Sequence, residues 1–317
     1  MLIYSKSELG RKAREFGFVR DAFEKMSRLI EILKFINNEP ELKTLLALKG
    51  GTAINLAIFD LPRLSVDIDM DFTDNITRDE MMIKRDRIND LLGRYMASVG
   101  YTLKAKSRHT HALDSFIYSY INAAGSPDNL KIEINYMLRS HAILPRDNIT
   151  QTNGVFSGFA IRMLDPIEIF ASKIVALSSR TAARDLYDVS NMITLKQFDD
   201  SELIQLRKCV VFYLTISGNE IKALSPNMLN AISEFKVRTE LHPMLRKTNR
   251  FDLQEACNHT STFLNEKMML TDNETMFVTR FNEGKFEPHL LFDDVNTIKR
   301  IEKHPMAMWR LKHIQNN

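Results

Sequence analysis

The chain has 317 residues, which suggests two domains and suffices for a core that needs no disulfide or structural metal. The formal net charge of +3 is too small for a dedicated nucleic-acid coat protein. Two distant cysteines and the absence of an apolar run of about 20 residues argue against a disulfide framework and a membrane-spanning segment. Because the N-terminus also lacks the apolar region of a signal peptide, we expect a cytoplasmic protein.

Apolar residues recur at helical spacing in the N-terminal part of the chain, and this pattern predicts an amphipathic helix over residues 20–37. Basic residues outnumber acidic ones in residues 1–30 and again in residues 299–312. Such excesses are typical of solvated helix faces, but they also fit a surface that contacts the phosphates of a polynucleotide.

A glycine pair follows residues 45–49, which are apolar except for Lys49. Gly50, Gly51 and Thr52 precede a short predicted helix over residues 53–59. Glycines allow the backbone to approach a phosphate closely, and the start of a helix favours anions. The alternative is an ordinary turn that begins a helix.

Apolar and acidic residues alternate strictly over residues 66–72, which predicts a half-buried strand. Asp67, Asp69 and Asp71 then share one face of this strand. Two carboxylates spaced about 6.6 Å apart along a strand can converge on a divalent cation such as Mg²⁺. An Asp-x-Asp pattern alone also occurs on solvated strands, so it needs support from other residues.

Helical spacing returns over residues 78–98, and three strands are predicted at 101–106, 115–121 and 130–137. The turn at 125–128 predicts that the last two strands form an antiparallel hairpin. Glu133 lies on one face of the third strand together with Lys131 and Asn135. This face either contributes a further acid to the site or is the exposed face of the hairpin.

The composition changes from mixed to helical near residue 165, after a further short strand at 159–163. Asp165 followed by Pro166 is a helix start, and we expect helices to about residue 179 and over residues 181–193. These features predict an α/β (α+β) fold, with a catalytic domain in residues 1–164 containing a mixed or antiparallel sheet and a mainly helical domain in residues 165–317.

Lys173 and Arg180 are seven residues apart and therefore share one face of a continuing helix. As cations they could hold a triphosphate. Arg184, Asp185 and Asp188 follow on the next helix. Their alternative role is a network of ion pairs that joins the two helices.

These motifs occur in the order found in a known family. Gly50-Gly51-Thr52, then Arg63-x-Ser65-x-Asp67-Ile68-Asp69, then an acidic strand, then Lys173-x6-Arg180-x3-Arg184-Asp185-Leu-Tyr-Asp188 resembles the AbiEii/AbiGii nucleotidyltransferase-like toxins. That family is part of the DNA polymerase β-like superfamily. The resemblance covers about residues 45–190, and the helical tail beyond residue 200 adds little to it.

The resemblance implies a role for each matching residue. Asp67 and Asp69 would bind Mg²⁺, and Glu133 stands where many members have a third catalytic Asp. Asp185 matches the acid of the last motif, and either Glu133 or Asp185 would accept the proton of the attacking hydroxyl. Asp71 is not expected to be a ligand, because the motif ends at Asp69. The residues expected to contact the nucleotide are Gly50, Gly51, Thr52, Ser65, Lys173 and Arg180.

The resemblance also implies a function. Members are toxins of type IV toxin–antitoxin or phage-defence modules, and the MenT group transfers nucleotides from an NTP to the 3′ end of tRNA. The partner antitoxin is typically a separate winged-helix protein. Two alternatives stay open: the acceptor is a small molecule or a protein hydroxyl, or the chain is a non-catalytic nucleotide-binding or interaction subunit. The second alternative predicts a lost carboxylate or lysine, and none is lost here.

Overall fold

The computed structural model describes residues 5–315 and divides them into two compact units. The first four residues, which entered the prediction about a signal peptide, lie outside the described part. The first unit consists of the chain up to Arg139 together with Pro145–Leu164 and Pro243–Asn249. The second contains Ser140–Leu144, Asp165–His242 and the chain from Arg250 onward. The main boundary between the units therefore follows Leu164. Two short segments are exceptions: Ser140–Leu144 belongs to the second unit and Pro243–Asn249 to the first.

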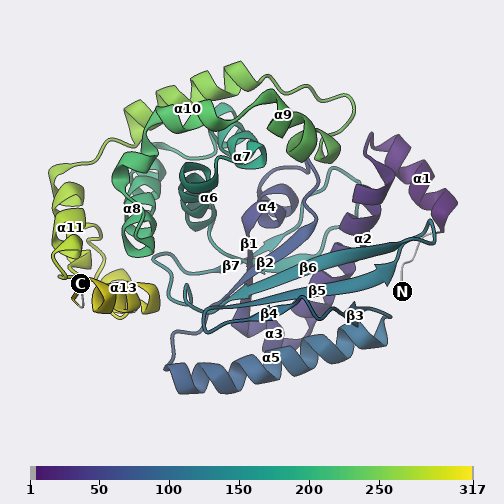
Figure 1. Ribbon diagram of the computed structural model, residues 1–317, viewed down its shortest axis with the longest axis horizontal. Coiled ribbons are helices and arrows are strands. Elements are labelled where there is room, and N and C mark those ends of the chain that lie inside the picture. Colours follow the sequence, from purple (N-terminus) through teal and green to yellow (C-terminus); the bar gives the residue numbers. More distant parts are fainter. Residues whose placement is uncertain (1–4, 316–317) are drawn as a thin grey trace. The chain divides into compact units, whose positions relative to one another are not determined.

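A mixed sheet forms the centre of the first unit, as the sequence predicts. Its strand order is β3–β5–β6–β2–β1–β8–β7, and β4 also pairs with β5 (Figure 1). The pairs β2–β6 and β1–β8 are parallel and the remaining pairs are antiparallel. The strands are β1 (Leu46–Lys49), β2 (Asp67–Phe72), β3 (Thr102–Leu103), β4 (Arg108–His109), β5 (Leu113–Ile121), β6 (Pro127–Asn135), β7 (Arg146–Ile149) and β8 (Ala160–Met163).

The alternation predicted for β2 is confirmed by its burial. Ile68, Met70 and Phe72 are at most 2% exposed, and they form the apolar face of the strand. On the neighbouring strand β6, Ile132 and Ile134 are also fully buried. The acidic side chains of β2 consequently point to the opposite face of the sheet, because successive residues of a strand alternate.

Some strand positions differ from the sequence-based prediction. The strand predicted over 101–106 shortens to the two residues of β3, and β1 was not predicted as a strand. Asn122–Ser126 makes the turn between β5 and β6, while Pro127 begins β6. Proline has no N–H to donate to a neighbouring strand, but the first residue of a strand is a position where proline is commonly found.

Helices of the first unit contribute to its core. They are α1 (Lys6–Glu15), α2 (Arg20–Asn38), α3 (Pro40–Leu45), α4 (Gly50–Ala53), the π-helical turn η1 (Ile54–Ile58) and α5 (Arg78–Ser98). The predicted helices at 20–37 and 78–98 are thus confirmed. Thr77 and Glu80 form a capping box that begins α5. The rings of Phe35 and Tyr95 stack with centroids 3.7 Å apart and join α2 to α5.

The second unit is helical. Its longer helices are α6 (Pro166–Arg180), α7 (Ala183–Thr194), α8 (Asp200–Ser217), α10 (Leu253–Lys267), α11 (Asp272–Asn282) and α13 (Pro305–Gln315). Its short elements are η2 (Ile221–Leu224), η3 (Pro226–Ala231), α9 (Glu234–Lys236), η4 (Val237–Leu241), η6 (Pro288–Leu290) and α12 (Val295–Ile301), and η5 (His242–Met244) crosses from the second unit into the first. Asp165 accepts a hydrogen bond from the backbone N–H of Ile167, which confirms the predicted helix start.

Aromatic packing around α8 forms the core of the second unit. The buried ring of Phe212 lies against Phe277, Phe286 and Phe292, with centroid distances from 5.9 to 6.4 Å. Gly218 ends α8 in the left-handed conformation that favours glycine. Within residues 5–315, no helix is both long enough and apolar enough to cross a bilayer.

Candidate active site

The turn between β1 and α4 lies directly against one of the predicted metal-binding carboxylates. Gly50 has a φ of +68°, a backbone conformation that residues other than glycine rarely adopt. A Cβ atom at Gly50 would lie 2.8 Å from Oδ2 of Asp69, closer than such a contact allows. Glycine is therefore required at this position both by the backbone and by the approach of the Asp69 side chain.

Gly51 has a different steric role. A Cβ atom here would lie 2.7 Å from Nη2 of Arg63 and 3.0 Å from Oγ of Ser65. Arg63 is only 2% exposed, and its Nη1 donates to the carbonyl of Leu64. The Gly-Gly turn and the Arg-x-Ser segment therefore pack against each other, which explains why these two parts of the first motif occur together.

The hydroxyl of Thr52 is used within the protein. Its Oγ1 donates to the carbonyl of Asp67 at 2.5 Å, and the side chain is buried. Asn55, one turn later, donates from Nδ2 to the carbonyl of Gly51 at 2.7 Å. These bonds fix the turn relative to the start of β2. The expected contact of Thr52 with a nucleotide stays a prediction. Because the hydroxyl already donates its hydrogen to Asp67, we expect the backbone N–H of Thr52 to make this contact.

The three acids of β2 lie in different environments. Asp67 and Asp69 are partly exposed, whereas Asp71 is buried. Nζ of Lys49 lies 2.6 Å from Oδ1 of Asp71, and the two form an ion pair on adjacent strands. This pair gives Asp71 a structural role, and it leaves Asp67 and Asp69 as the accessible carboxylates of the strand.

Glu133 lies beside Asp69. The two residues are paired in register on the parallel strands β2 and β6, so their side chains leave the sheet on the same face. The strand spacing places their backbones about 4.8 Å apart. Nζ of Lys131 lies 2.8 Å from Oε2 of Glu133. Sequence reasoning placed Glu133 on the correct face, but its position next to Asp69 depends on the order of the strands.

The donor set of this site is made of hard oxygen atoms. Across the described residues, no group of three or more His, Cys, Asp or Glu side chains converges closely enough to hold a metal alone. The carboxylate oxygens of Asp67 and Asp69 could supply two ligands to a divalent cation. This fits Mg²⁺, which commonly binds one or two carboxylates and completes its shell with water and substrate phosphates.

Sequence reasoning missed two residues of the first motif. The motif assigns no role to Lys49 or Arg63, yet Lys49 forms an ion pair with Asp71 and Arg63 packs against Gly51. The sequence contained one indication that Arg63 has a specific role: it is a charged residue between the apolar residues Pro62 and Leu64. Such a residue is seldom buried without a specific partner.

The later motif forms an ion-pair network within the second unit. Lys173 is buried, and its Nζ lies 2.9 Å from Oδ1 of Asp185 and 3.1 Å from Oδ2 of Asp188. Arg180 donates from Nε and Nη2 to the two oxygens of Asp185. The network therefore joins α6 to α7, as one of the two alternatives from the sequence predicts. The proposed contact of Lys173 and Arg180 with nucleotide phosphates stays a prediction.

The charge of Asp185 is strongly stabilised. Burial by itself would raise the pKa of this carboxyl, but the charges and hydrogen bonds of Lys173 and Arg180 outweigh it and lower the pKa to about 2. Asp185 is consequently a fixed anion at neutral pH. A carboxylate with so low a pKa is a weak proton acceptor.

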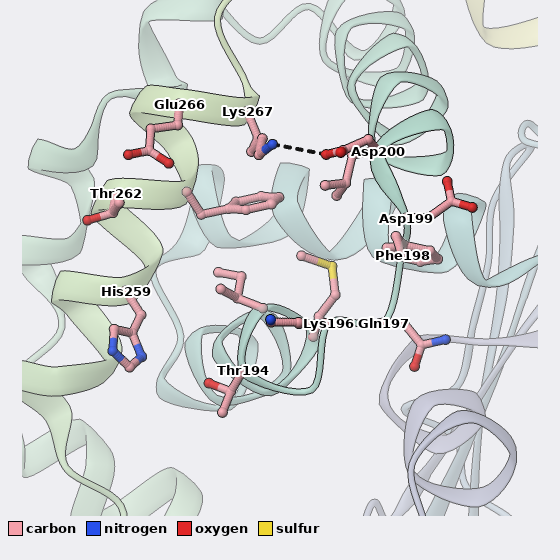
Figure 2. A pocket seen from close by; sticks show the side chains of 14 residues that line it. Thr194, Lys196, Gln197, Phe198, Asp199, Asp200, His259, Thr262, Glu266 and Lys267 are labelled. Carbon is pink, nitrogen blue, oxygen red and sulfur yellow. Dashed lines mark hydrogen bonds and ion pairs between the residues drawn. The ribbon is translucent and has the colours of Figure 1, made fainter.

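A hollow of about 820 Å³ lies in the second unit between the C-terminal end of α7, the start of α8 and α10 (Figure 2). Phe198 and Phe263 are among its apolar lining residues, and Lys196, His259 and Glu266 lie among its polar ones. None of the residues predicted from the motifs lines this hollow. The predicted residues instead form the two groups described above, one in each unit.

Comparison with known families identifies the chain. The family model described as "Nucleotidyl transferase AbiEii toxin, Type IV TA system" matches residues 32–259, which is more than half of the sequence and includes both groups of motif residues. The chain belongs to this family. AbiEii members are nucleotidyltransferase toxins of type IV toxin–antitoxin systems, so the resemblance inferred from the motifs is confirmed.

A solved structure shows the same fold. MenT4, a nucleotidyltransferase toxin from Mycobacterium tuberculosis H37Rv, is similar to this chain with a TM-score of 0.62 at 14% sequence identity. The similarity covers 97% of this chain and 99% of MenT4. Comparison with curated proteins gives no match. At this level of identity the likeness to MenT4 concerns the fold, which agrees with the predicted mixed sheet and helical C-terminal part.

Proposed function

We propose that this AbiEii-family chain transfers a nucleotide from an NTP to the 3′-terminal hydroxyl of tRNA, with Mg²⁺ as its cofactor. The observation that carries the proposal is the arrangement of Asp67, Asp69 and Glu133. Two accessible carboxylates share one strand face, and a third lies in register beside them on β6. Nucleotidyl transfer needs metal-binding oxygens and a proton acceptor in this proximity.

Mg²⁺, when bound by Asp67 and Asp69, would neutralise phosphate charge and favour the departure of pyrophosphate. The protein contributes by positioning the substrates. The Gly50–Gly51 turn offers backbone close to Asp69 without an intervening Cβ atom, so a phosphate can approach both. Lys173 and Arg180 are the cations that the family motif assigns to the phosphates. This positioning requires no covalent intermediate with the protein.

Glu133 is assigned as the proton acceptor. In the proposed reaction the acceptor oxygen forms a bond to the α-phosphorus, its proton passes to Glu133, and the bond to pyrophosphate breaks. Asp185 is the other candidate from the sequence. Its low pKa and its bonds to Lys173 and Arg180 make it unsuitable, because a general base needs a pKa nearer the working pH.

The proposal includes an antitoxin. Membership of a type IV toxin–antitoxin family implies a partner that opposes toxicity. We assign this role to a separate winged-helix protein encoded beside the chain, as the resemblance implies. Expression of the chain alone should then arrest growth, and expression of the neighbouring protein should relieve the arrest.

Incubation with labelled NTPs tests the reaction directly. Purified protein is mixed with one labelled NTP at a time, Mg²⁺ and total cellular RNA, and the products are separated by size. Label in a band of tRNA size supports the proposal, and loss of that band on adding EDTA supports the role of the metal. Label on protein, or only on an added small-molecule acceptor, would contradict the tRNA assignment.

A variant distinguishes this site from a contaminating activity. Asp69→Asn removes a metal-binding charge but keeps the shape of the side chain. The variant should lose label transfer to background. Full transfer by Asp69→Asn would show that the activity belongs to another site or another protein.

A further inference from the structure

A run of exposed basic residues lies at the edge of the sheet that carries the candidate active site. Lys104, Lys106 and Arg108 are all exposed, and we refer to these three residues as the basic edge. Arg108 belongs to β4, and the two lysines lie in the segment between β3 and β4, beside β5 (Figure 1). The motifs discussed above do not include any of them.

The positive charge of the basic edge is not neutralised. Residues 101–113 contain no Asp or Glu, and no ion pair is found for Lys104, Lys106 or Arg108 within residues 5–315. The first acid beyond this segment is Asp114. It is buried and engaged by Arg85, whose Nε donates to Oδ2 of Asp114 at 2.9 Å. The basic edge therefore presents free cations to its surroundings.

The register of the strands places Arg108 on the same face as the catalytic carboxylates. Arg108 pairs with Ser115, Ser115 pairs with Glu133, and Glu133 pairs with Asp69. Paired residues of adjacent strands point to the same side of a sheet. These four residues consequently form one row across β4, β5, β6 and β2. Three strand spacings separate Asp69 from Arg108, which is about 14 Å.

The neighbouring histidine confirms this orientation. His109 pairs with Asp114, and its Nδ1 lies 2.7 Å from Oδ1 of that residue. Asp114 is held by Arg85 of α5, so His109 and Asp114 point to the face that α5 covers. Arg108 is adjacent to His109 and must point to the opposite face, because successive strand residues alternate.

Hydrogen bonds hold the basic edge in place. The backbone N–H of Lys104 donates to the carbonyl of Ile117 at 2.8 Å, and that of Ser107 donates to the carbonyl of Lys104 at 3.0 Å. Oγ of Ser107 accepts from the N–H of Ile117 at 3.0 Å. The backbone of this segment is thus fixed to β5.

We propose that the basic edge binds the phosphate backbone of the acceptor polynucleotide and directs its reactive end along this face of the sheet to Glu133 and Asp69. This inference rests on the proposed nucleotidyl transfer and adds the location of the acceptor. Exposed, uncompensated cations bind phosphates without reading sequence.

The test measures RNA binding without NTP. The triple variant Lys104→Ala/Lys106→Ala/Arg108→Ala is compared with the wild type for binding of a total tRNA pool over a range of salt concentrations. Each phosphate contact to a single strand contributes about 0.7 to the slope of log K against log salt, so the slope should fall by about 2. At physiological salt the affinity should fall at least ~10-fold.

A second triple variant supplies the matched control. Arg78, Arg87 and Arg94 lie on α5, and their side chains are 74, 47 and 73% exposed. Changing these three arginines to alanine removes the same charge, and RNA binding should be nearly unchanged. Thermal melting of both variants checks that they fold. Equal losses in the two variants would overturn the proposal, because they would show an effect of net charge alone.

Transfer kinetics separate this inference from the proposed function. If the wild type labels RNA, the variant of the basic edge should show a KM for RNA raised at least ~10-fold and an unchanged kcat. An unchanged KM would refute the basic edge and leave the proposed reaction intact. If the wild type labels no RNA, the proposed function fails as well.

Binding to vesicles that contain anionic lipid is a further test of the basic edge. Wild-type binding to vesicles that depends on the basic edge, with RNA binding unaffected, would assign the surface to a membrane and overturn the inference.

Discussion

Asp67, Asp69 and Asp71 show how one strand assigns different roles to residues of the same type. Lys49 pairs with Asp71 in a buried position, and Gly50 leaves room for Asp69. The first acid of the motif keeps an accessible side chain, while its carbonyl holds Thr52. The neighbours of each carboxylate on β1 and α4 therefore decide whether it stabilises the fold or remains available to a ligand.

Neutralising these acids one at a time should separate the two roles. Asp67→Asn and Asp69→Asn should abolish transfer and change stability by no more than about 0.5 kcal/mol, as expected at accessible positions. Asp71→Asn leaves the partly exposed Lys49 without its charged partner at a buried position and should cost about 1–3 kcal/mol. Urea unfolding measures the predicted change in stability, and label transfer on the same preparations measures the predicted loss of activity. Unfolding of Asp69→Asn at markedly lower urea would show that this residue is structural.

The approach of Gly50 to Asp69 can be tested with a pair of glycine variants. Gly50 and Gly100 both have positive φ, but only Gly50 has an atom within 4 Å of an added Cβ. Each change to alanine should cost about 1–2 kcal/mol for the backbone. Only Gly50→Ala should also displace Asp69 and reduce kcat, by about 100-fold. Equal transfer by the two variants would mean that the position of Asp69 does not depend on Gly50.

At the level of elements, α6 and α7 are joined by charges rather than by apolar contacts alone. Lys173 of α6 is held by Asp185 and Asp188 of α7, and Arg180 covers Asp185 from the exposed side. A buried ion-pair network of this kind stabilises the structure only while every partner is present and charged. The family motif in this segment thus has a structural role whether or not it also contacts phosphate.

Acid unfolding should reveal this network. The pKa of Asp185 is lowered from 3.8 to about 2, so the unfolded state binds protons before the folded state does. The stabilisation is therefore fully present above about pH 4 and is lost as the pH falls toward 2. At pH 7, Asp185→Asn should cost about 2–3 kcal/mol, and the difference from the wild type should shrink as the pH decreases to 2.

Asp293→Asn is the control for that measurement. Asp293 also pairs with a lysine, Lys208, but its side chain is 93% exposed. An exposed ion pair contributes little to stability, so the free energy of unfolding of this variant should lie within about 0.5 kcal/mol of the wild-type value at every pH. A pH-independent loss in Asp185→Asn would show that its packing, rather than its charge, stabilises the helices.

For the whole molecule, each unit has its own core and its own group of motif residues. The metal and the NTP are proposed to bind the folded protein, so binding should raise its stability by mass action. With Mg²⁺ and an NTP at about 100 times its Kd, the gain should be about 2.7 kcal/mol. Thermal melting with each NTP in turn would also identify the preferred base.

This stabilisation should depend on the carboxylates of β2. Asp67→Asn and Asp69→Asn should not gain stability from Mg²⁺ and NTP, and EDTA should remove the gain of the wild type. The same increase in Tm for all three proteins would place nucleotide binding elsewhere in the molecule.

Local sequence patterns predicted the elements with regular spacing. The helices α2 and α5 begin and end within a residue of their predicted bounds, since their apolar stripes and the Thr77 capping box are local signals. Short strands such as β1 and β4 were not predicted. Two to four residues are too few to show a period, and their strand conformation depends on pairing with β2 and β5.

The sequence by itself determined the family, the alternation that presents Asp67 and Asp69, and the helix start at Asp165, because these depend on residue type and spacing along the chain. Only the tertiary structure decided that Glu133 lies beside Asp69, that Lys49 removes Asp71 from the accessible acids, and that Arg108 shares their row. These relations depend on strand order and register. Strand pairing joins Asp69 to Glu133, 64 positions away, and Leu48 to Met163, 115 positions away, and no local pattern encodes such pairs.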